Sequence, residues 1–396
     1  MKYKLSEKVN ALKPSIIREI LKQMSDPTLI SFAGGSPSAL SFPVDAIKKY
    51  SAELLENDPL SVMQYSITEG YSPLIDTVSK FANRKFNVKK DADSVIITSG
   101  SQQIIDFMTK CLCNEGDIIA CEDVAFLGAL NTFKSYGAIL KGVKNDATNS
   151  IDLEHLEYIF KTFSPKFFYT IPNFQNPTGY TMPLEKRKAV YNLACKYNVP
   201  ILEDDPYGQI RFNGEELPPI KSFDNDNAVI YAGSLSKILC PGFRVAYAIG
   251  SNELLKHMVI AKQGSDIHTN IWAQRVCNEI LTKEDMEEHI KKIAKIYKKN
   301  CDLMIDNMNI YFSPKVKYQK PDGGMFIWVT MPDNVDVMGF INEALENKVA
   351  IIPGSAFLSD ENALCQSFRM NFSTPTEENI VKGVKILGDL TKKYCG

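Results

Sequence analysis

"SVIITSGSQQIIDFM", residues 94–108, runs from a β-branched strand through a Ser-Gly-Ser turn directly into a helix, which we expect to begin at Ser101. The same rhythm of an apolar strand followed by a helical pattern returns with "DIIAC", "FFYTI" and "VPILEDD", and "AVIYAG" and "VAYAIG" follow as further buried strands. Strands that alternate with helices are typical of βαβ units. The alternation therefore predicts an α/β domain with a mostly parallel sheet.

The pattern of the chain changes near residue 284. Residues 284–308 carry apolar side chains at helical spacing and predict one long amphipathic helix, after which hairpin-like strands lead to a final helix from about Glu377. We therefore expect three parts. These are an N-terminal segment that belongs to the small domain (1–42), a large α/β domain (43–283) and a smaller α+β domain (284–396).

The composition excludes several classes of protein. The 396 residues are 44% hydrophobic and 23% charged, as in an ordinary globular protein, and the formal net charge of −2 leaves no basic footprint for nucleic acid or an anionic membrane. No apolar run approaches the roughly 20 residues that span a bilayer. Nine irregularly spaced cysteines and a start without an apolar signal region favour a cytoplasmic protein, and four scattered histidines predict no metal site.

The turn at the start of the helix in residues 94–108 is a candidate anion site. The first amides of a helix and the positive end of its dipole attract a phosphate, Gly100 lets the backbone approach closely, and Ser101 and Gln102 add donors. A helix capped by a serine after a tight turn explains the same residues without a ligand. This stretch alone leaves both explanations open.

Two further candidate sites follow strands. "EDDPYGQI" places Asp204 at the end of an apolar strand with Tyr207 three residues later, where ligands of open α/β sheets bind. A carboxylate there is suited to a cationic ring nitrogen. Asn176, in "NPTG" after "FFYTI", could present its amide to a ligand oxygen. A solvated Asp-Pro loop and a simple turn are the ordinary alternatives.

"SLSKILCPGFR", residues 234–244, contains a lysine in an unusually apolar stretch. Burial lowers the affinity of a lysine for its proton, so Lys237 is suited to form a Schiff base with an aldehyde. Ser234 and Ser236 offer hydroxyl groups, and Arg244 offers a bidentate cation for a phosphate. A lysine in a surface loop is the ordinary alternative, since most lysines are exposed.

Together these features fit one cofactor, pyridoxal phosphate, which has an aldehyde, a ring nitrogen and a phosphate. Lys237 would bind the aldehyde, Asp204 would keep the ring nitrogen protonated, and Asn176 and Tyr207 would bond the ring hydroxyl oxygen. The residues expected at the phosphate are Ser101, Gln102, Ser234 and Arg244, with Ser236 as a further candidate.

The ordered set "SGSQQ", "NPTG", "DDPY", "SLSK" with Arg244, and "FRMNFS" resembles the class I aminotransferases of the aspartate aminotransferase superfamily. "ISFAGGSPSALSFP", "MQYSITEG" and "PGSAF" are most similar to its 2-aminoadipate, kynurenine and aromatic branch. The resemblance covers nearly the whole chain. It implies the α/β fold of pyridoxal-phosphate-dependent transferases, in which helices enclose a mostly parallel seven-stranded sheet and a smaller α+β domain is attached.

The resemblance also implies how the substrate is held. Arg369, in "FRMNFS", is similar to the arginine that grips the α-carboxylate of the substrate, assisted by Asn176 and the backbone of Gly35. Phe126, in "EDVAFLG", stands where the family stacks an aromatic ring on the cofactor. Tyrosine is common there, so any role that depends on its hydroxyl group is in doubt.

Two more matches concern the partner subunit and the closing of the site. Tyr65, in "MQYSITEG", is similar to a tyrosine that reaches the phosphate of the neighbouring subunit, which implies a homodimer. Arg18, in "PSIIREIL", is similar to an arginine on a mobile N-terminal helix that helps to close the site and to select side chains. An arginine on a helix face explains Arg18 nearly as well.

The expected reaction is ping-pong transamination between an L-amino acid and a 2-oxo acid, with Lys237 as the general base and 2-oxoglutarate as an acceptor. Aminoadipate, aromatic and aliphatic donors all stay open. A cysteine-conjugate β-lyase of the same fold is one alternative. The cofactor-binding effector domain of a transcription regulator is another, which the neutral charge and the roughly 30 residues before "ISFAGG" disfavour.

Overall fold

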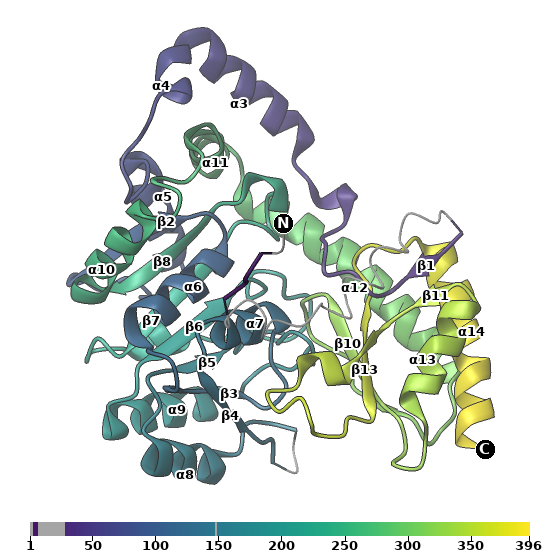
Figure 1. The fold of residues 1–396 in the computed structure, drawn as a ribbon. Helices are drawn as coiled ribbons and strands as arrows, with labels where there is room; N and C mark the ends of the chain where they lie inside the picture. Colours follow the sequence, from purple (N-terminus) through teal and green to yellow (C-terminus); the bar gives the residue numbers. More distant parts are fainter. Residues whose placement is uncertain (1–2, 7–27, 147–148) are drawn as a thin grey trace.

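The computed structural model describes residues 3–6, 28–146 and 149–396, and a seven-stranded sheet lies at its centre (Figure 1). Within this sheet β8 runs antiparallel to both of its neighbours, and the other neighbouring pairs are parallel. The predicted mostly parallel sheet is therefore confirmed. The strands, in spatial order, are β2 (Asp93–Thr98), β8 (Ala246–Ser251), β7 (Val229–Ser234), β6 (Ile201–Asp205), β5 (Phe168–Thr170), β3 (Ile118–Glu122) and β4 (Ile139–Val143).

Helices cover both faces of this sheet, because successive side chains of a buried strand point to opposite faces. On β6, Leu202 packs into the cluster formed with one set of helices and Ile201 packs into the cluster on the other side. The first set is α6 (Ser101–Leu112), α7 (Leu127–Ser135) and α10 (Asn252–Gln263). The opposite face carries α5 (Ser72–Asn83), α8 (Leu153–Phe163), α9 (Leu184–Tyr197) and α11 (Ile271–Lys283).

The long amphipathic helix expected at 284–308 is α12 (Met286–Tyr311), and the Asp285 side chain caps it by accepting from the Glu288 amide. A four-stranded antiparallel sheet follows, in the order β12 (Ile352–Pro353), β13 (Ser367–Asn371), β10 (Phe326–Thr330) and β9 (Lys317–Tyr318). The helices α13 (Val337–Glu346) and α14 (Glu377–Cys395) belong to the same part of the chain.

The described N-terminal segment runs back to this second part, since β1 (Ile30–Ser31) pairs in parallel with β11 (Val349–Ala350). The division of the chain at residues 42 and 283 stays a prediction. The remaining elements are η2 (Ala39–Ser41), α3 (Val44–Asn57), α4 (Pro59–Met63), η3 (Ile220–Phe223), η4 (Pro241–Phe243) and η5 (Gly354–Phe357).

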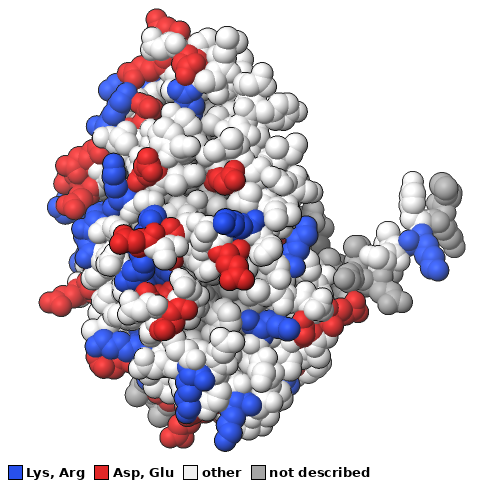
Figure 2. Space-filling model, turned by 90° about the vertical axis from the view of Figure 1, so that its left-hand side faces the viewer, with Lys and Arg blue, Asp and Glu red and all other residues white. Residues whose placement is uncertain are grey.

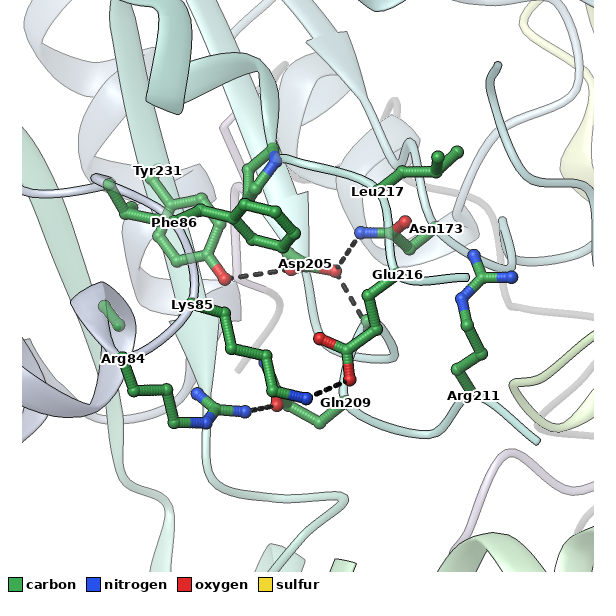
Figure 3. A pocket seen from close by; sticks show the side chains of 14 residues that line it. Arg84, Lys85, Phe86, Asn173, Asp205, Gln209, Arg211, Glu216, Leu217 and Tyr231 are labelled. Carbon is green, nitrogen blue, oxygen red and sulfur yellow. Dashed lines mark hydrogen bonds and ion pairs between the residues drawn. The ribbon is translucent and has the colours of Figure 1, made fainter. Parts of the chain in front are cut away.

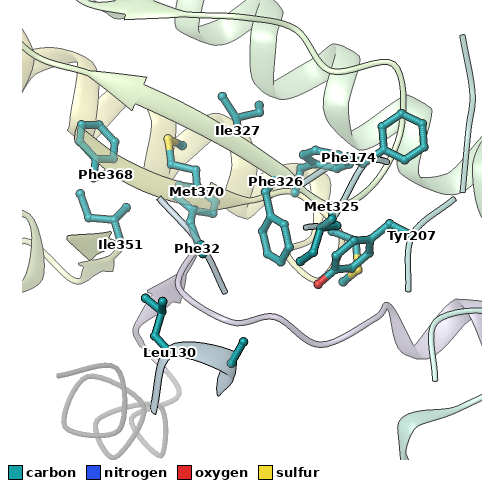
Figure 4. Packing of buried hydrophobic residues seen from close by; sticks show 14 of the residues in the cluster. Phe32, Leu130, Phe174, Tyr207, Met325, Phe326, Ile327, Ile351, Phe368 and Met370 are labelled. Carbon is teal, nitrogen blue, oxygen red and sulfur yellow. The ribbon is translucent and has the colours of Figure 1, made fainter. Parts of the chain in front are cut away.

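One hydrophobic cluster joins the two sheets. It includes Leu202 of the large sheet and Phe326 of β10, and the ring of Tyr207 meets that of Phe326 edge to face at 5.7 Å (Figure 4). β13 pairs with β10, so that Arg369 stands opposite Trp328. The packing of the small sheet therefore sets Arg369 beside the loops that follow the central strands.

The surface carries both charge signs. On the face seen in Figure 2, Lys and Arg side chains are interspersed with Asp and Glu side chains. No helix in the described part of the chain is long and apolar enough to cross a membrane.

Candidate active site

A cavity of about 500 Å³ lies at the carboxyl ends of the central strands, where ligands of open α/β sheets bind. Among the predicted site residues that the structure describes, all except Tyr65 line it. The predicted residues in its wall are Gly35, Ser101, Gln102, Phe126, Asn176, Asp204, Tyr207, Ser234, Ser236, Lys237, Arg244 and Arg369. Motifs from β5, β6, β7 and the small sheet therefore meet in one place.

Lys237 has the environment expected of a reactive amine. Its Nζ donates a hydrogen bond to the carbonyl oxygen of Gly35 at 2.9 Å. Burial lowers the pKa of Lys237 to about 8, and the positive charges of Arg244 and Arg369 add to this effect. A substantial fraction of the amine is therefore neutral just above neutral pH.

Asp204 is almost fully buried and has one free acceptor. Its Oδ2 accepts from the Tyr169 hydroxyl group at 2.9 Å, whereas its Oδ1 is buried and has no hydrogen-bond partner among the described residues. Burial raises the pKa of Asp204 to about 7, although the bond from Tyr169 opposes the shift. A cationic N–H donor at Oδ1 would satisfy this oxygen and stabilise the carboxylate.

The neighbouring carboxylate points the other way, because side chains alternate along β6. Asp205 accepts from the Tyr231 hydroxyl group at 2.9 Å, from Asn173 Nδ2 at 3.0 Å and from the Gly208 amide at 3.0 Å (Figure 3). These bonds anchor the strand and the turn after it. They therefore fix the strand end that carries Asp204 toward the cavity.

Asn176 joins the two sheets within the cavity. Its Nδ2 donates to the Tyr207 hydroxyl oxygen at 3.3 Å, and its Oδ1 accepts from Arg369 Nη1 at 2.7 Å. Arg369 Nη2 also donates to the Ala33 carbonyl oxygen at 2.7 Å. The guanidinium group lies over the ring of Phe326 at 4.3 Å.

Arg369 retains a donor for a ligand. Its Nε is buried and has no hydrogen-bond partner among the described residues. Burial lowers the pKa of Arg369 to about 10, so the side chain stays charged at neutral pH. A buried cation with an unsatisfied donor in a cavity wall is suited to bind a carboxylate.

The start of α6, which we expect to bind an anion, contributes Ser101 and Gln102 to the cavity wall. Gly100 has a φ of +86°, and an added Cβ there would lie 2.1 Å from Arg244 Nη2, so the turn and the arginine are closely packed. Gln102 Nε2 donates to the Gly128 carbonyl oxygen and to Thr132 Oγ1. Both N–H groups of the Gln102 side chain are therefore bonded to acceptors in α7. Only the backbone N–H of Gln102 remains for an anion.

The two serines of "SLSK" belong to the same end of the cavity. Ser234 Oγ accepts a hydrogen bond from the Ser236 backbone amide at 3.2 Å. This bond shapes the turn between β7 and Lys237. The Ser234 hydroxyl group keeps its proton available for a ligand.

Among the described residues, Tyr65 is the predicted site residue that lies elsewhere. The Tyr65 side chain is 78% exposed and outside the cavity, with its ring edge against His268 at 5.9 Å. Arg18 lies outside the described residues. In the described part of the chain, no group of His, Cys, Asp or Glu side chains is arranged to hold a metal ion.

Sequence reasoning missed several residues of the site. Phe357 and Leu127 line the cavity and give it an apolar wall, and Tyr169 supports Asp204 from beneath. "PGSAF" could have indicated Phe357. The sequence could not have indicated the role of Tyr169, because an aromatic residue within a strand such as "FFYTI" is typical of a core position.

Comparison with known proteins identifies the family of this fold and site. Residues 27–387 match the family model described as aminotransferase class I and II. The chain is similar to aromatic-amino-acid aminotransferase 1 of Thermococcus litoralis, with 36% identity over 98% of this chain and 94% of the relative.

Solved structures give the same result. The kynurenine aminotransferase of Pyrococcus horikoshii, in complex with PMP, has a TM-score of 0.94 and 36% identity over 98% of this chain and 97% of that one. LysN, the α-aminoadipate aminotransferase of Thermus thermophilus, is complexed with N-(5'-phosphopyridoxyl)-L-leucine. It has a TM-score of 0.90 and 32% identity over 98% of this chain and 97% of that one.

Proposed function

The chain belongs to the class I and II aminotransferases, pyridoxal-phosphate-dependent enzymes that transfer amino groups, and on that premise we propose that it exchanges an amino group between an L-amino acid and a 2-oxo acid. The observation that carries the proposal is the convergence of Lys237, Asp204 and Arg369 on one cavity. These side chains offer an amine, a carboxylate and a carboxylate-binding cation.

The residues present fit the cofactor. Asp204 Oδ1 is a buried acceptor without a partner among the described residues, which is the group that a protonated ring nitrogen requires. Asn176 and Tyr207 stand within 3.3 Å of each other and would bond the ring hydroxyl oxygen. The backbone amide of Ser101 and the side chain of Arg244 would hold the phosphate, together with Ser234 and Ser236. Phe126 would stack on the ring.

Pyridoxal phosphate, when bound, supplies an aldehyde that condenses with amines and a ring that withdraws electrons from the α-carbon of an amino acid. Lys237 Nζ would hold this aldehyde between turnovers and would move the proton of the α-carbon during them. Arg369 would orient the α-carboxylate, with Asn176 and the Gly35 backbone beside it. One keto acid would leave before the next binds, so we expect ping-pong kinetics.

We expect the reaction of Lys237 with the cofactor to depend on pH. The pKa of Lys237 is about 8 instead of the usual 10.5, and only the neutral amine attacks an aldehyde. The rate of cofactor attachment to cofactor-free protein should therefore rise about tenfold per pH unit below pH 8 and level off above it. Stopped-flow absorbance measures this rate. A rate that still rises steeply beyond pH 10 would contradict the lowered pKa.

The substrate follows from the relatives and from the cavity wall. Relatives named for aromatic amino acids, kynurenine and α-aminoadipate support donors of these classes. We propose 2-oxoglutarate as an acceptor. Leu127 and Phe357, which the cofactor ring does not use, give the wall an apolar and aromatic surface. This surface supports aromatic donors first, because burial of an aromatic side chain against it is favourable.

A panel of amino acids tests the proposal. Each donor is mixed with the purified holoenzyme without an acceptor, and the loss of the visible absorbance of the bound cofactor reports the first half-reaction. We expect aromatic donors and 2-aminoadipate to react, and 2-oxoglutarate to restore the absorbance. Release of pyruvate and ammonia from a cysteine conjugate without a 2-oxo acid would instead favour the β-lyase.

We also propose a homodimer in which Tyr65 reaches the site of the other subunit. The support is a concentration of exposed hydrophobic side chains between residues 40 and 67, on or near α3 and α4, because such concentrations often mark interfaces. Its members, besides Tyr65, are Leu40, Val44, Leu55, Leu60, Met63 and Ile67. A sedimentation measurement should give twice the chain mass of 44.4 kDa, and a single-chain mass would overturn the dimer.

A cytoplasmic location is part of the proposal as well. All nine cysteines are free of disulfide bonds, which is typical of reducing compartments. Cell fractionation tests this location, and recovery of the protein outside the cytoplasm would refute it.

A further inference from the structure

A buried polar cluster lies directly behind the turn at the start of α6, and none of the roles assigned above uses it. Its centre is Lys262 of α10, whose side chain is 0% exposed. Lys262 Nζ donates to Gln103 Oε1 at 2.9 Å, to Asp266 Oδ1 at 2.7 Å and to Thr269 Oγ1 at 3.0 Å. All three donors of the ammonium group are therefore satisfied by polar groups of the cluster.

Hydrogen bonds from the cluster hold Ser99, the residue that precedes the turn at Gly100 and Ser101. Ser99 Oγ donates to Asp266 Oδ2 at 2.5 Å, and the Ser99 amide donates to Gln103 Oε1 at 2.8 Å. The Ser99 carbonyl oxygen accepts from Arg244 Nη2 at 3.4 Å. Each polar group of Ser99 is thus bonded either to the cluster or to the arginine expected to bind the phosphate.

The position of Ser99 matters because the turn that follows it is closely packed. Gly100 adopts a left-handed φ of +86°, and Arg244 packs so closely that an added Cβ would lie 2.1 Å from its Nη2. A small rotation of the Ser99 peptide would therefore change both the direction of the Ser101 amide and the space for Arg244. The Lys262–Asp266 pair is only partly buried, since the Asp266 side chain is 28% exposed, and a pair of this kind contributes little net stability. The contribution of the Lys262–Asp266 pair is instead its fixed geometry, which holds Ser99 and the turn in place.

We propose that Lys262, Asp266 and Ser99 are positioning residues for the phosphate of the cofactor. The Lys262–Asp266 pair sets Ser99, and Ser99 in turn fixes the amide of Ser101 and the guanidinium group of Arg244. The inference rests on the proposed phosphate site at Ser101 and Arg244. According to this inference, the cluster makes the protein bind the phosphorylated form of the cofactor more tightly than the unphosphorylated form.

The experiment compares two ligands in the full-length chain. Dissociation constants are measured for pyridoxal phosphate and for pyridoxal, which lacks the phosphate, after removal of the bound cofactor. For Lys262→Met and for Ser99→Ala we expect a loss of about tenfold or more in affinity for pyridoxal phosphate, and less than about twofold for pyridoxal. Ser99→Ala leaves the Lys262–Asp266 ion pair intact, so it tests the inference even if Lys262→Met fails to fold.

Lys221→Met is the matched control. Lys221 is equally buried and pairs with Asp93 at 2.9 Å and Asp224 at 2.7 Å, near the amino ends of β2 and β7. Its loss should lower the melting temperature but leave the ratio of the two dissociation constants unchanged.

Three results would overturn the inference. They are equal losses for both ligands in the Lys262 and Ser99 variants, no loss for either ligand, and a phosphate-specific loss in Lys221→Met. If the unaltered chain itself binds pyridoxal as tightly as pyridoxal phosphate, the proposed phosphate site fails, and this inference fails with it.

Discussion

Replacement of Lys237 by alanine should lower kcat by about 10³-fold or more, because the substitution removes the group that moves the α-proton. The methyl group of alanine has no basic atom, and no other amine lines the described cavity. The variant should also lose the yellow colour that the cofactor has when it is bound to an amine. Steady-state kinetics and an absorbance spectrum measure the two effects.

The same variant should still bind the cofactor. The expected contacts to its ring and phosphate come from Asp204, Arg244 and the start of α6, and none of them involves Nζ. Cofactor that remains after gel filtration therefore separates a lost proton carrier from a collapsed site. The exposed Lys256 of α10 provides a control, since Lys256→Ala should leave activity unchanged. Normal turnover by Lys237→Ala would remove the central assignment.

The sequence predicted most of this site because its parts follow strands. A parallel sheet brings the carboxyl ends of its strands to one edge, so Asn176, Asp204 and Ser234 had to converge once their strands were placed. Asp204 was chosen for its place at the end of an apolar strand, and the alternation of side chains along β6 separates it from its neighbour Asp205. The structure places Asp204 in the cavity and Asp205 on the other side, against Tyr231.

Other features could not be predicted from local patterns. Arg369 lies on a different sheet, and only the resemblance to a family assigned it to the site. Gln102 carries an amide that suits a phosphate, yet its side chain is bonded within α7, a tertiary contact that no sequence period reveals. The sequence gives no sign that Lys262 is buried. Its burial depends on how α10 packs against the turn at Ser99, which is a tertiary contact.

Replacement of Arg369 by alanine should raise the KM of amino and keto acids while the cofactor stays bound. Truncating one member of a desolvated charge pair costs roughly 2 to 5 kcal/mol, so kcat/KM should fall by between about 30-fold and about 5,000-fold. The loss should be similar for every substrate, because each carries the same α-carboxylate. A donor panel with full kinetics measures it.

Arg369→Lys distinguishes charge from geometry. Lysine keeps a positive charge but lacks the planar fork that bonds Asn176 Oδ1 and the Ala33 carbonyl oxygen at the same time. We therefore expect an intermediate loss. Substitution also disturbs the packing on Phe326, so the melting temperature and the cofactor spectrum must be recorded beside the kinetics. If both variants bind every substrate as tightly as the unaltered enzyme does, the α-carboxylate is held by another group, and the unsatisfied Nε of Arg369 needs a different ligand.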